Sequence, residues 1–273
     1  MNTTGQLGVV ITGGSAGLGL ALAAGFLEAG DRVAICGRDA VRLAGALDDL
    51  VLRVPSGEVH GMVCDVSRPS ELTGFLSFVR ERLGRVDRWI NNAGSAGTLQ
   101  RPLWDLDSGE MLEVCSTNLA GSMMASGEVV GLMLRQPPSL RPLYHLFNMG
   151  FSPAGARFSR SSLPHRVSKT AVASLTAFLS EELLRNGVGS IGVHELSPGL
   201  VRTELLFRGV SPETRRFLEH VAEDPERVAK ALVPKIRRIS SRSRPVRHAS
   251  FPGILFRSLK AVLVSRMARP ATS

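Results

Sequence analysis

The stretch TGGSAGLG, from Thr12 to Gly19, directly follows the apolar run Leu7 to Ile11. A short β-branched run, then glycines, then apolar residues at helical spacing predicts a strand, a tight turn and a helix. The free N–H groups and the positive dipole end of such a helix face an anion such as a pyrophosphate. The stretch therefore indicates a site for a dinucleotide at the end of the first strand.

Each glycine of this turn has its own expected role. Gly13 takes backbone angles closed to other residues, Gly17 lets a ligand approach the main chain, and Gly19 lets the helix pack closely on the sheet. With Ser15 and Leu18, these glycines are the first expected cofactor-binding residues.

Two other interpretations of the same residues remain open. Gly13 to Gly17 also fits the G-x-S-x-G nucleophile elbow of α/β-hydrolases. That reading needs several strands before the elbow, and it leaves Gly19 without a role. The second alternative is a glycine-rich turn that binds nothing.

The 273 residues contain no linker and no low-complexity tract, so we expect one α/β domain, within residues 1–234. Three distant cysteines indicate reduced thiols, and the histidines lack metal-ligand spacing, so no metal is expected. No run is long and apolar enough to span a bilayer, and no signal or transit peptide is visible.

The positive charge gathers in residues 235–273, which hold 10 Lys or Arg and no Asp or Glu. We interpret this segment as a basic, partly apolar tail. Residues 254–267 place apolar side chains on one helical face, so the tail fits either the surface of a membrane or a dimer contact. A third explanation is that the many arginines reflect codon bias alone and serve no function. No nucleic-acid recognition module is present, so no nucleic-acid partner is expected.

The second predicted strand, Arg32 to Cys36, is followed by Gly37 and Arg38. In dinucleotide folds an acid at this place binds the adenine ribose, whereas an arginine accommodates a 2′-phosphate. Because Gly37 occupies the place of the acid, Arg38 favours NADPH over NADH. Asp39 directly precedes a helical pattern and is predicted to be its N-cap.

Strands continue to alternate with helices, which predicts a Rossmann-type, doubly wound parallel sheet with helices on both faces. Polar and small residues follow these strands, where a cofactor binds in such sheets. They add to the expected cofactor site Asp65, Val66, Asn92, Ala93, Gly94, Pro198, Gly199 and Thr203. The further expected strands are 59–64, 86–90, 143–147 and 191–196, and the expected helices include 69–83, 105–134 and 164–185.

These motifs, in this order, resemble the short-chain dehydrogenase/reductase superfamily from end to end. The strings WINNAG, STNLAGS, HLFNM, HELSPGLVRTELL and RVAKALVPKIR are similar to the chlorophyll b reductase family of plants and algae. The resemblance implies an NADPH-dependent reductase that converts the formyl group of chlorophyll b or chlorophyllide b to hydroxymethyl. It also implies a chloroplast location, in the thylakoid membrane or stroma, and an oligomer with itself or with a related reductase.

The resemblance further implies four catalytic positions. Lys169 matches the lysine that binds the ribose, Asn118 matches the asparagine that holds a proton-relaying water, and Ser152 has the spacing of the serine that orients the carbonyl. His165 occupies the position of the tyrosine that acts as the acid in this superfamily. The chain's one tyrosine, Tyr144, lies in the fifth predicted strand and cannot replace it.

His165 decides how far this function transfers. An imidazole beside a lysine is mostly neutral, yet a neutral imidazole still has one N–H to donate to a carbonyl oxygen. We therefore expect His165 to supply the proton, directly or through water. The alternative is a cofactor-binding pseudoenzyme that acts as a partner subunit or scaffold. Residues 203–210 are expected to form an apolar lid over the substrate, or simply to pack on the next helix.

Overall fold

The computed structural model describes residues 5–97, 101–151, 156, 159, 161–207 and 210–248. All strands of its seven-stranded sheet are parallel, in the order β3-β2-β1-β4-β5-β6-β7. This confirms the predicted doubly wound fold. The strands are β1 Gly8–Thr12, β2 Arg32–Gly37, β3 Val59–Val63, β4 Arg88–Asn91, β5 Tyr144–Met149, β6 Ile191–Ser197 and β7 Val246–Arg247.

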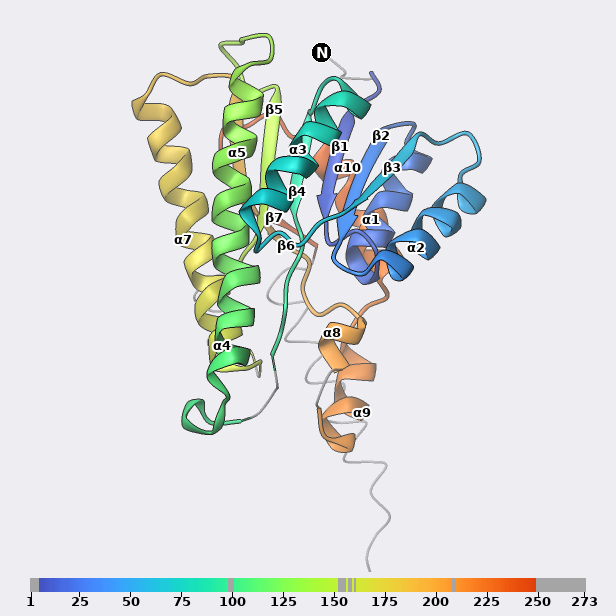
Figure 1. Cartoon of the computed structure of the whole chain (residues 1–273), viewed down its shortest axis with the longest axis vertical. Coiled ribbons are helices and arrows are strands. Elements are labelled where there is room, and N and C mark those ends of the chain that lie inside the picture. Colours follow the sequence, from blue (N-terminus) through green and yellow to red (C-terminus); the bar gives the residue numbers. More distant parts are fainter. Residues whose placement is uncertain are drawn as a thin grey trace, which may run out of the picture.

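Helices cover both faces of the sheet (Figure 1). Helices α1, α2 and α10 pack on one face, and α3, α5 and α7 pack on the other. The sheet is therefore buried on both sides, as the apolar strands predict. The helices are α1 Gly17–Glu28, α2 Ala40–Arg53, α3 Pro69–Leu83, α4 Ser108–Cys115, α5 Ser122–Leu134, α7 Leu163–Arg185, α8 Glu204–Phe207, α9 Pro212–Val221 and α10 Pro225–Arg238.

The strand order reverses between β1 and β4, which lie side by side in the sheet. A ligand crevice forms at such a switch point, outside the carboxyl ends of the strands. Helices α4, α8 and α9 lie beyond this end of the sheet (Figure 1). The topology therefore brings the glycine turn after β1 next to the segment after β4.

The helix expected over residues 105–134 is interrupted. A short 3₁₀ turn, η1, covers Leu103–Asp105, and a π-helical turn, η2, covers Ser116–Gly121 between α4 and α5. Such π turns often occur at functional sites. Asn118 lies inside η2, so the irregular backbone coincides with an expected catalytic residue.

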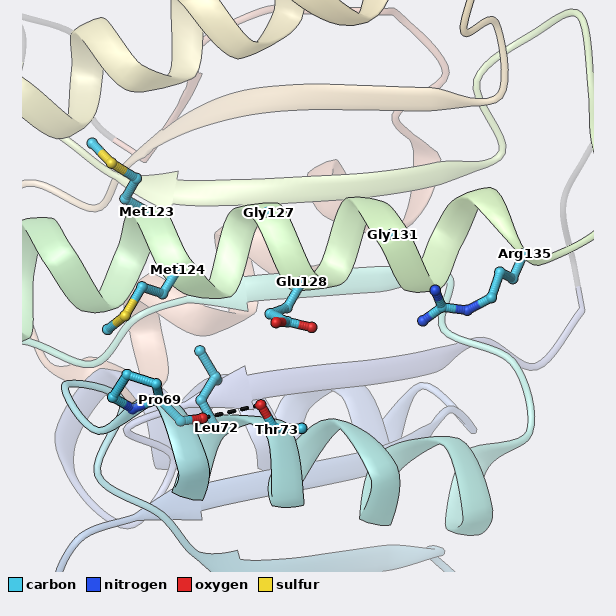
Figure 2. Close-up of a pocket in the computed structure, with 9 residues that line it drawn as sticks. All are labelled: Pro69, Leu72, Thr73, Met123, Met124, Gly127, Glu128, Gly131 and Arg135. Atoms are coloured by element: carbon cyan, nitrogen blue, oxygen red, sulfur yellow. Dashed lines mark hydrogen bonds between the residues drawn. The ribbon is translucent and has the colours of Figure 1, made fainter.

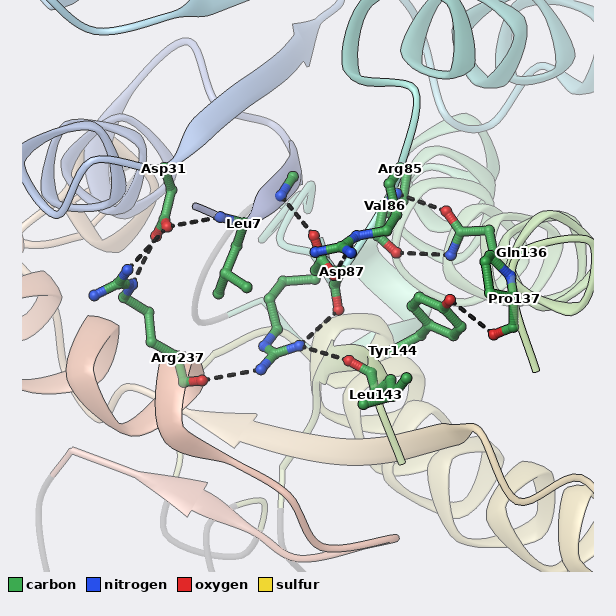
Figure 3. A network of polar contacts seen from close by, with 12 residues as sticks. Leu7, Asp31, Arg85, Val86, Asp87, Gln136, Pro137, Leu143, Tyr144 and Arg237 are labelled. Atoms are coloured by element: carbon green, nitrogen blue, oxygen red, sulfur yellow. Dashed lines mark hydrogen bonds and ion pairs between the residues drawn. The ribbon is translucent and has the colours of Figure 1, made fainter. Parts of the chain in front are cut away.

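The fourth strand begins at Arg88 rather than at Val86, because a side chain and not a neighbouring strand pairs with the backbone of Val86. Gln136 receives the N–H of Val86 and donates to its carbonyl, at 2.7 and 3.0 Å (Figure 3). The neighbouring Tyr144 donates its hydroxyl to the carbonyl of Pro137 at 2.9 Å. Its hydroxyl is thus engaged at the amino end of β5, away from the crevice, as the sequence predicts.

The division expected after residue 234 falls inside α10, and the chain then continues to β7, a strand that the sequence analysis missed. The buried Arg88 holds this part of the chain. It donates to the carbonyls of Ile236 and Arg237 at 3.0 and 2.9 Å. Residues 235–248 therefore belong to the folded body, and the apolar stretch 254–267 lies outside the described residues. Within the described part, no helix has the length and hydropathy needed to cross a membrane.

Candidate active site

The glycine turn after β1 leaves no room for side chains. Gly13 and Gly17 have φ of 64° and 54°, a region that favours glycine. A Cβ at Gly13 would lie 2.8 Å from the Cα of Ala93, and one at Gly19 would overlap the carbonyl oxygen of Gly13. The turn is thus shaped by close packing of backbone on backbone.

The N-terminus of α1 is open to an anion. Its N-cap, Ala16, supplies no side-chain hydrogen bond, and no acidic residue lies in the first turn. By contrast, Asp39 caps α2 by accepting from the N–H of Arg42 at 2.9 Å, which confirms its predicted role. The glycine turn and the uncapped helix end fit a bound pyrophosphate.

Gly37 ends β2, and Arg38 follows it at the carboxyl end of the strand. A Cβ at Gly37 would lie 2.6 Å from the hydroxyl of Ser15, so glycine here makes room for the turn. Arg38 is exposed, and its guanidinium pairs with Glu113 of α4 at 3.2 Å. Gly37 thus leaves the place of a ribose-binding acid without a side chain, and the exposed guanidinium of Arg38 follows directly.

Asp65, after β3, accepts from the N–H and the hydroxyl of Ser67 at 2.9 and 2.6 Å. Burial raises its pKa, but these hydrogen bonds and the charges of Arg38 and Arg68 outweigh burial, so the pKa falls below its usual range. Val66 is buried against α5's side of the sheet. Asp65 is thus an ionised acceptor at the edge of the crevice.

Asn92 ties the glycine turn to β4. Its amide donates to the carbonyls of Thr12 and Gly13, both at 2.9 Å. In return, the hydroxyl of Thr12 accepts from the N–H groups of Asn92 and Ala93, both at 3.1 Å. Asn92 and Ala93 therefore hold the glycine turn in place, and Thr12 is a partner that sequence reasoning missed.

The catalytic candidates meet around the backbone of Ser95. Its carbonyl oxygen accepts from Nδ2 of Asn118 and from Nδ1 of His165, both at 2.9 Å. Its N–H donates to Oδ1 of Asn118 at 2.8 Å. Asn118 also donates to the hydroxyl of Ser168 at 3.0 Å. Asn118 is thus fully engaged in joining η2, α7 and the segment after β4.

His165 lies in the first turn of α7 and is buried, with the ring of Phe151 edge-on to it at 5.5 Å between centroids. Burial and the charge of Lys169 lower its pKa to about 4. The imidazole is therefore neutral near pH 7, as the sequence analysis predicts. Its N–H is donated to the Ser95 carbonyl, so in this structure that N–H points to the main chain.

Lys169 follows His165 by one helical turn and is also buried. Burial lowers the pKa of its ammonium to about 8. A Cβ at Gly94 would lie 3.5 Å from Nζ of Lys169 and 3.2 Å from Oδ1 of Asn118. The structure thus brings together Gly94, Asn118, His165 and Lys169.

The residues after β6 return to the glycine turn. Gly199 has φ of 81°, and the methyl group of Thr203 would lie 2.9 Å from a Cβ at Gly17. Helix α8 follows at once, and the ring of Phe207 lies 5.2 Å under the guanidinium of Arg215 in α9. This contact matches the packing alternative for the expected lid. Pro198 lies in the same connection, between β6 and Gly199.

Some of the expected residues lie outside the described residues, and two serines that were not expected take part in the site. Ser152 lies outside the described residues, as do residues 208–209 of the expected lid. Ser95 and Ser162 were missed; the hydroxyl of Ser162 donates to the carbonyl of Ala96 at 2.7 Å and caps α7. Ser95 acts through its main chain, so its side chain gives no signal in the sequence.

An open groove of about 400 Å³ lies elsewhere, between α3 and α5 (Figure 2). It contains none of the expected site residues, and its lining includes Leu72 and Met124. This groove is separate from the crevice at the switch point. Among the described residues, no cluster of three or more His, Cys, Asp or Glu is arranged to hold a metal.

Comparison with known proteins agrees with this geometry. The chain is 37% identical over 232 residues to chlorophyll(ide) b reductase NOL, chloroplastic, of Oryza sativa subsp. japonica, covering 85% of this chain and 66% of the relative. It is 32% identical over 266 residues to the probable chlorophyll(ide) b reductase NYC1, chloroplastic, of the same plant, covering 92% of this chain and 51% of the relative. The chain thus spans between half and two thirds of the length of these relatives.

Two solved structures share the fold. A short-chain dehydrogenase/reductase from Burkholderia phymatum in complex with NAD is 25% identical, with a TM-score of 0.76 and coverage of 100% of this chain and 99% of that one. A variant of actinorhodin polyketide ketoreductase with NADPH is 26% identical, with a TM-score of 0.72 and coverage of 91% and 98%. The family model for short chain dehydrogenases matches residues 8–211. These matches exclude the hydrolase elbow, and the chain belongs to the short-chain dehydrogenase/reductase family.

Proposed function

We propose that the chain is an NADPH-dependent reductase that converts the formyl group of chlorophyll b or chlorophyllide b to a hydroxymethyl group. The observation that carries this proposal is the meeting of Lys169, His165 and Asn118 beside the glycine turn, at the switch point of the sheet. The named relatives supply the substrate class, since one is named a chlorophyll(ide) b reductase and the other a probable chlorophyll(ide) b reductase.

The cofactor would lie across the carboxyl ends of the strands. The uncapped N-terminus of α1 would hold the pyrophosphate, Arg38 the 2′-phosphate, and Lys169 the ribose near the nicotinamide. The further cofactor contacts that we propose come from Asp65, Val66, Ala93, Gly94, Pro198, Gly199 and Thr203. When bound, the nicotinamide supplies the hydride. The chloroplast is the proposed location, because the relatives are chloroplastic.

The test mixes the purified chain with NADPH and chlorophyllide b, and follows the hydroxymethyl product by chromatography. Chlorophyllide a, which carries a methyl group in place of the formyl group, is the matched control. Product from chlorophyllide b alone supports the proposal. NADPH binding in a calorimeter without any turnover, with activity restored by His165→Tyr, identifies a pseudoenzyme instead. Absence of NADPH binding contradicts both functions.

A further inference from the structure

The hydrogen bond between His165 and Ser95 fixes which nitrogen of the imidazole carries the proton. The carbonyl oxygen of Ser95 has no hydrogen to give, so Nδ1 of His165 is the donor across the 2.9 Å contact. A neutral imidazole has a single N–H. Nε2 therefore carries a lone pair, and toward any ligand it can only accept a hydrogen bond.

The surroundings keep the ring in this state. Phe151 packs edge-on against the imidazole, and the same Ser95 carbonyl is held in place by Asn118 at 2.9 Å. Rotation of the ring would leave Nδ1–H without its buried acceptor. Burial and Lys169 lower the pKa of His165 to about 4, so the doubly protonated form is scarce at neutral pH.

Apart from the hydroxyl of Ser95, which is buried without a hydrogen-bond partner, the other polar groups of the cluster have already used their hydrogens. Both described hydrogen bonds from Nδ2 of Asn118 go to Ser95 and Ser168. The hydroxyl of Ser168 donates to the carbonyl of His165 at 3.0 Å. In the described part of the cluster, the ammonium of Lys169 is thus the group that carries acidic protons. The neighbours that face it are His165, which is neutral, and the uncharged Gly94 and Asn118.

We propose that Lys169, rather than His165, donates the proton that completes carbonyl reduction, while Nε2 of His165 accepts a hydrogen bond from that ammonium or from the new hydroxyl group. This inference rests on the proposed function. The carbonyl carbon gains a hydride from the reduced nicotinamide, which is oxidised, and the π electrons of C=O move to the oxygen. As the O–H bond forms, an N–H bond of Lys169 breaks, and solvent then returns a proton to the amine. His165 is in this account a positioning residue.

The ring nitrogens are tested by NMR of protein labelled with ¹⁵N-histidine and saturated with NADPH. The His165 signals, assigned by their loss in His165→Gln, are expected to show a protonated Nδ1 and a bare Nε2 from pH 5.5 to 8. A protonated Nε2, or titration within that range, contradicts the proposal. This readout does not depend on turnover, so it stands apart from the outcome of the functional test.

The proton donor is tested by single-turnover rates with chlorophyllide b. Glutamine can donate to Ser95 and accept from Lys169, but it is not an acid, so His165→Gln should stay within about 10-fold of the original rate. Lys169→Arg keeps the charge but holds its protons too tightly, and should lose roughly 100- to 10,000-fold in the single-turnover rate, measured at saturating NADPH. The original rate should fall as pH rises through about 8, where the ammonium loses its proton. The opposite ranking of the two variants overturns the proposal, whereas an inactive original chain that binds NADPH contradicts the proposed function itself.

Discussion

The two halves of the sheet, on either side of the switch point between β1 and β4, bury different kinds of side chain. The half with β1, β2 and β3 buries few polar side chains. Among the described residues before residue 86, the buried polar side chains are those of Thr12 and Asp31. The side of β4, β5 and β6 buries many, including Asn91 and Asn148, whose amides meet at 2.8 Å. The nucleotide side is thus shaped by backbone packing, and the catalytic side by paired polar groups.

This difference explains why the glycine turn and the polar cluster around Ser95 tolerate amino-acid substitutions to different extents. A glycine turn built from touching backbones has no alternative residue to offer, since an added Cβ overlaps main-chain atoms. In a polar cluster, however, one hydrogen-bond donor can replace another if the new hydrogen also finds an acceptor. His165 is accommodated because the Ser95 carbonyl accepts its N–H.

The largest effect should come from breaking the polar side at Arg88. Arg88 is 3% exposed, and its guanidinium donates to the carbonyls of Asp87, Leu143, Ile236 and Arg237. Arg88→Met leaves these buried acceptors unpaired and should lower the free energy of unfolding by about 3–5 kcal/mol, measured by urea denaturation.

Arg185→Met is the matched control. Arg185 is largely exposed and pairs with Glu181 within α7. Its loss should change the midpoint of unfolding little. Equal losses in both variants would mean that the carbonyls around Arg88 find other donors, and the catalytic side would then depend less on its hydrogen bonds.

The next effect concerns the nucleotide side. In Gly19→Ala the new methyl group would overlap the Gly13 carbonyl and lie 2.5 Å from Nδ2 of Asn92. The turn must then open, and NADPH affinity in a calorimeter should fall by about 100-fold, or about 2.7 kcal/mol. In Gly45→Ala, on an exposed part of α2 with nothing within 4 Å of the added carbon, affinity should be unchanged.

A smaller effect is expected at Arg38, which sharpens the choice between the two nucleotides. Arg38→Ala should weaken NADPH binding by about 10-fold, or about 1.4 kcal/mol, and leave NADH binding as it was, because only NADPH carries the 2′-phosphate. Glu113→Gln frees Arg38 from its 3.2 Å ion pair and should strengthen NADPH binding slightly. Parallel losses for both nucleotides after Arg38→Ala would refute the assigned preference.

The same comparison explains what the sequence could predict. The glycine turn and the strand order follow from local patterns of glycines and apolar residues, so the fold was predicted from them. The π turn at Ser116–Gly121 was missed because its sequence reads as continuous helix, and β7 because two residues carry no periodicity.

The polar cluster was predicted only as a set of positions. Which hydrogen bonds form depends on pairs far apart in the chain, such as His165 with the carbonyl of Ser95. A main-chain carbonyl leaves no signature in the amino-acid sequence. The resemblance could therefore name His165, but not say where its N–H points.

The smallest effect that we predict is the contribution of a single buried histidine to the pH dependence of stability. The buried histidines of the described part are His145 in β5, His165 in α7 and His194 in β6. Burial, helped by neighbouring positive charges, lowers their pKa values to about 2, 4 and 4.

Because these pKa values lie below that of an unfolded histidine, the unfolded chain binds more protons as the pH falls below about 6.5. The free energy of unfolding should therefore decrease between pH 7 and 5.5, by about 1 kcal/mol for each histidine. Urea denaturation of His165→Gln should show a decrease smaller by one such contribution, since glutamine does not titrate. An unchanged decrease would mean that His165 is already charged in the folded protein, and its imidazole would then have a second N–H to offer a substrate.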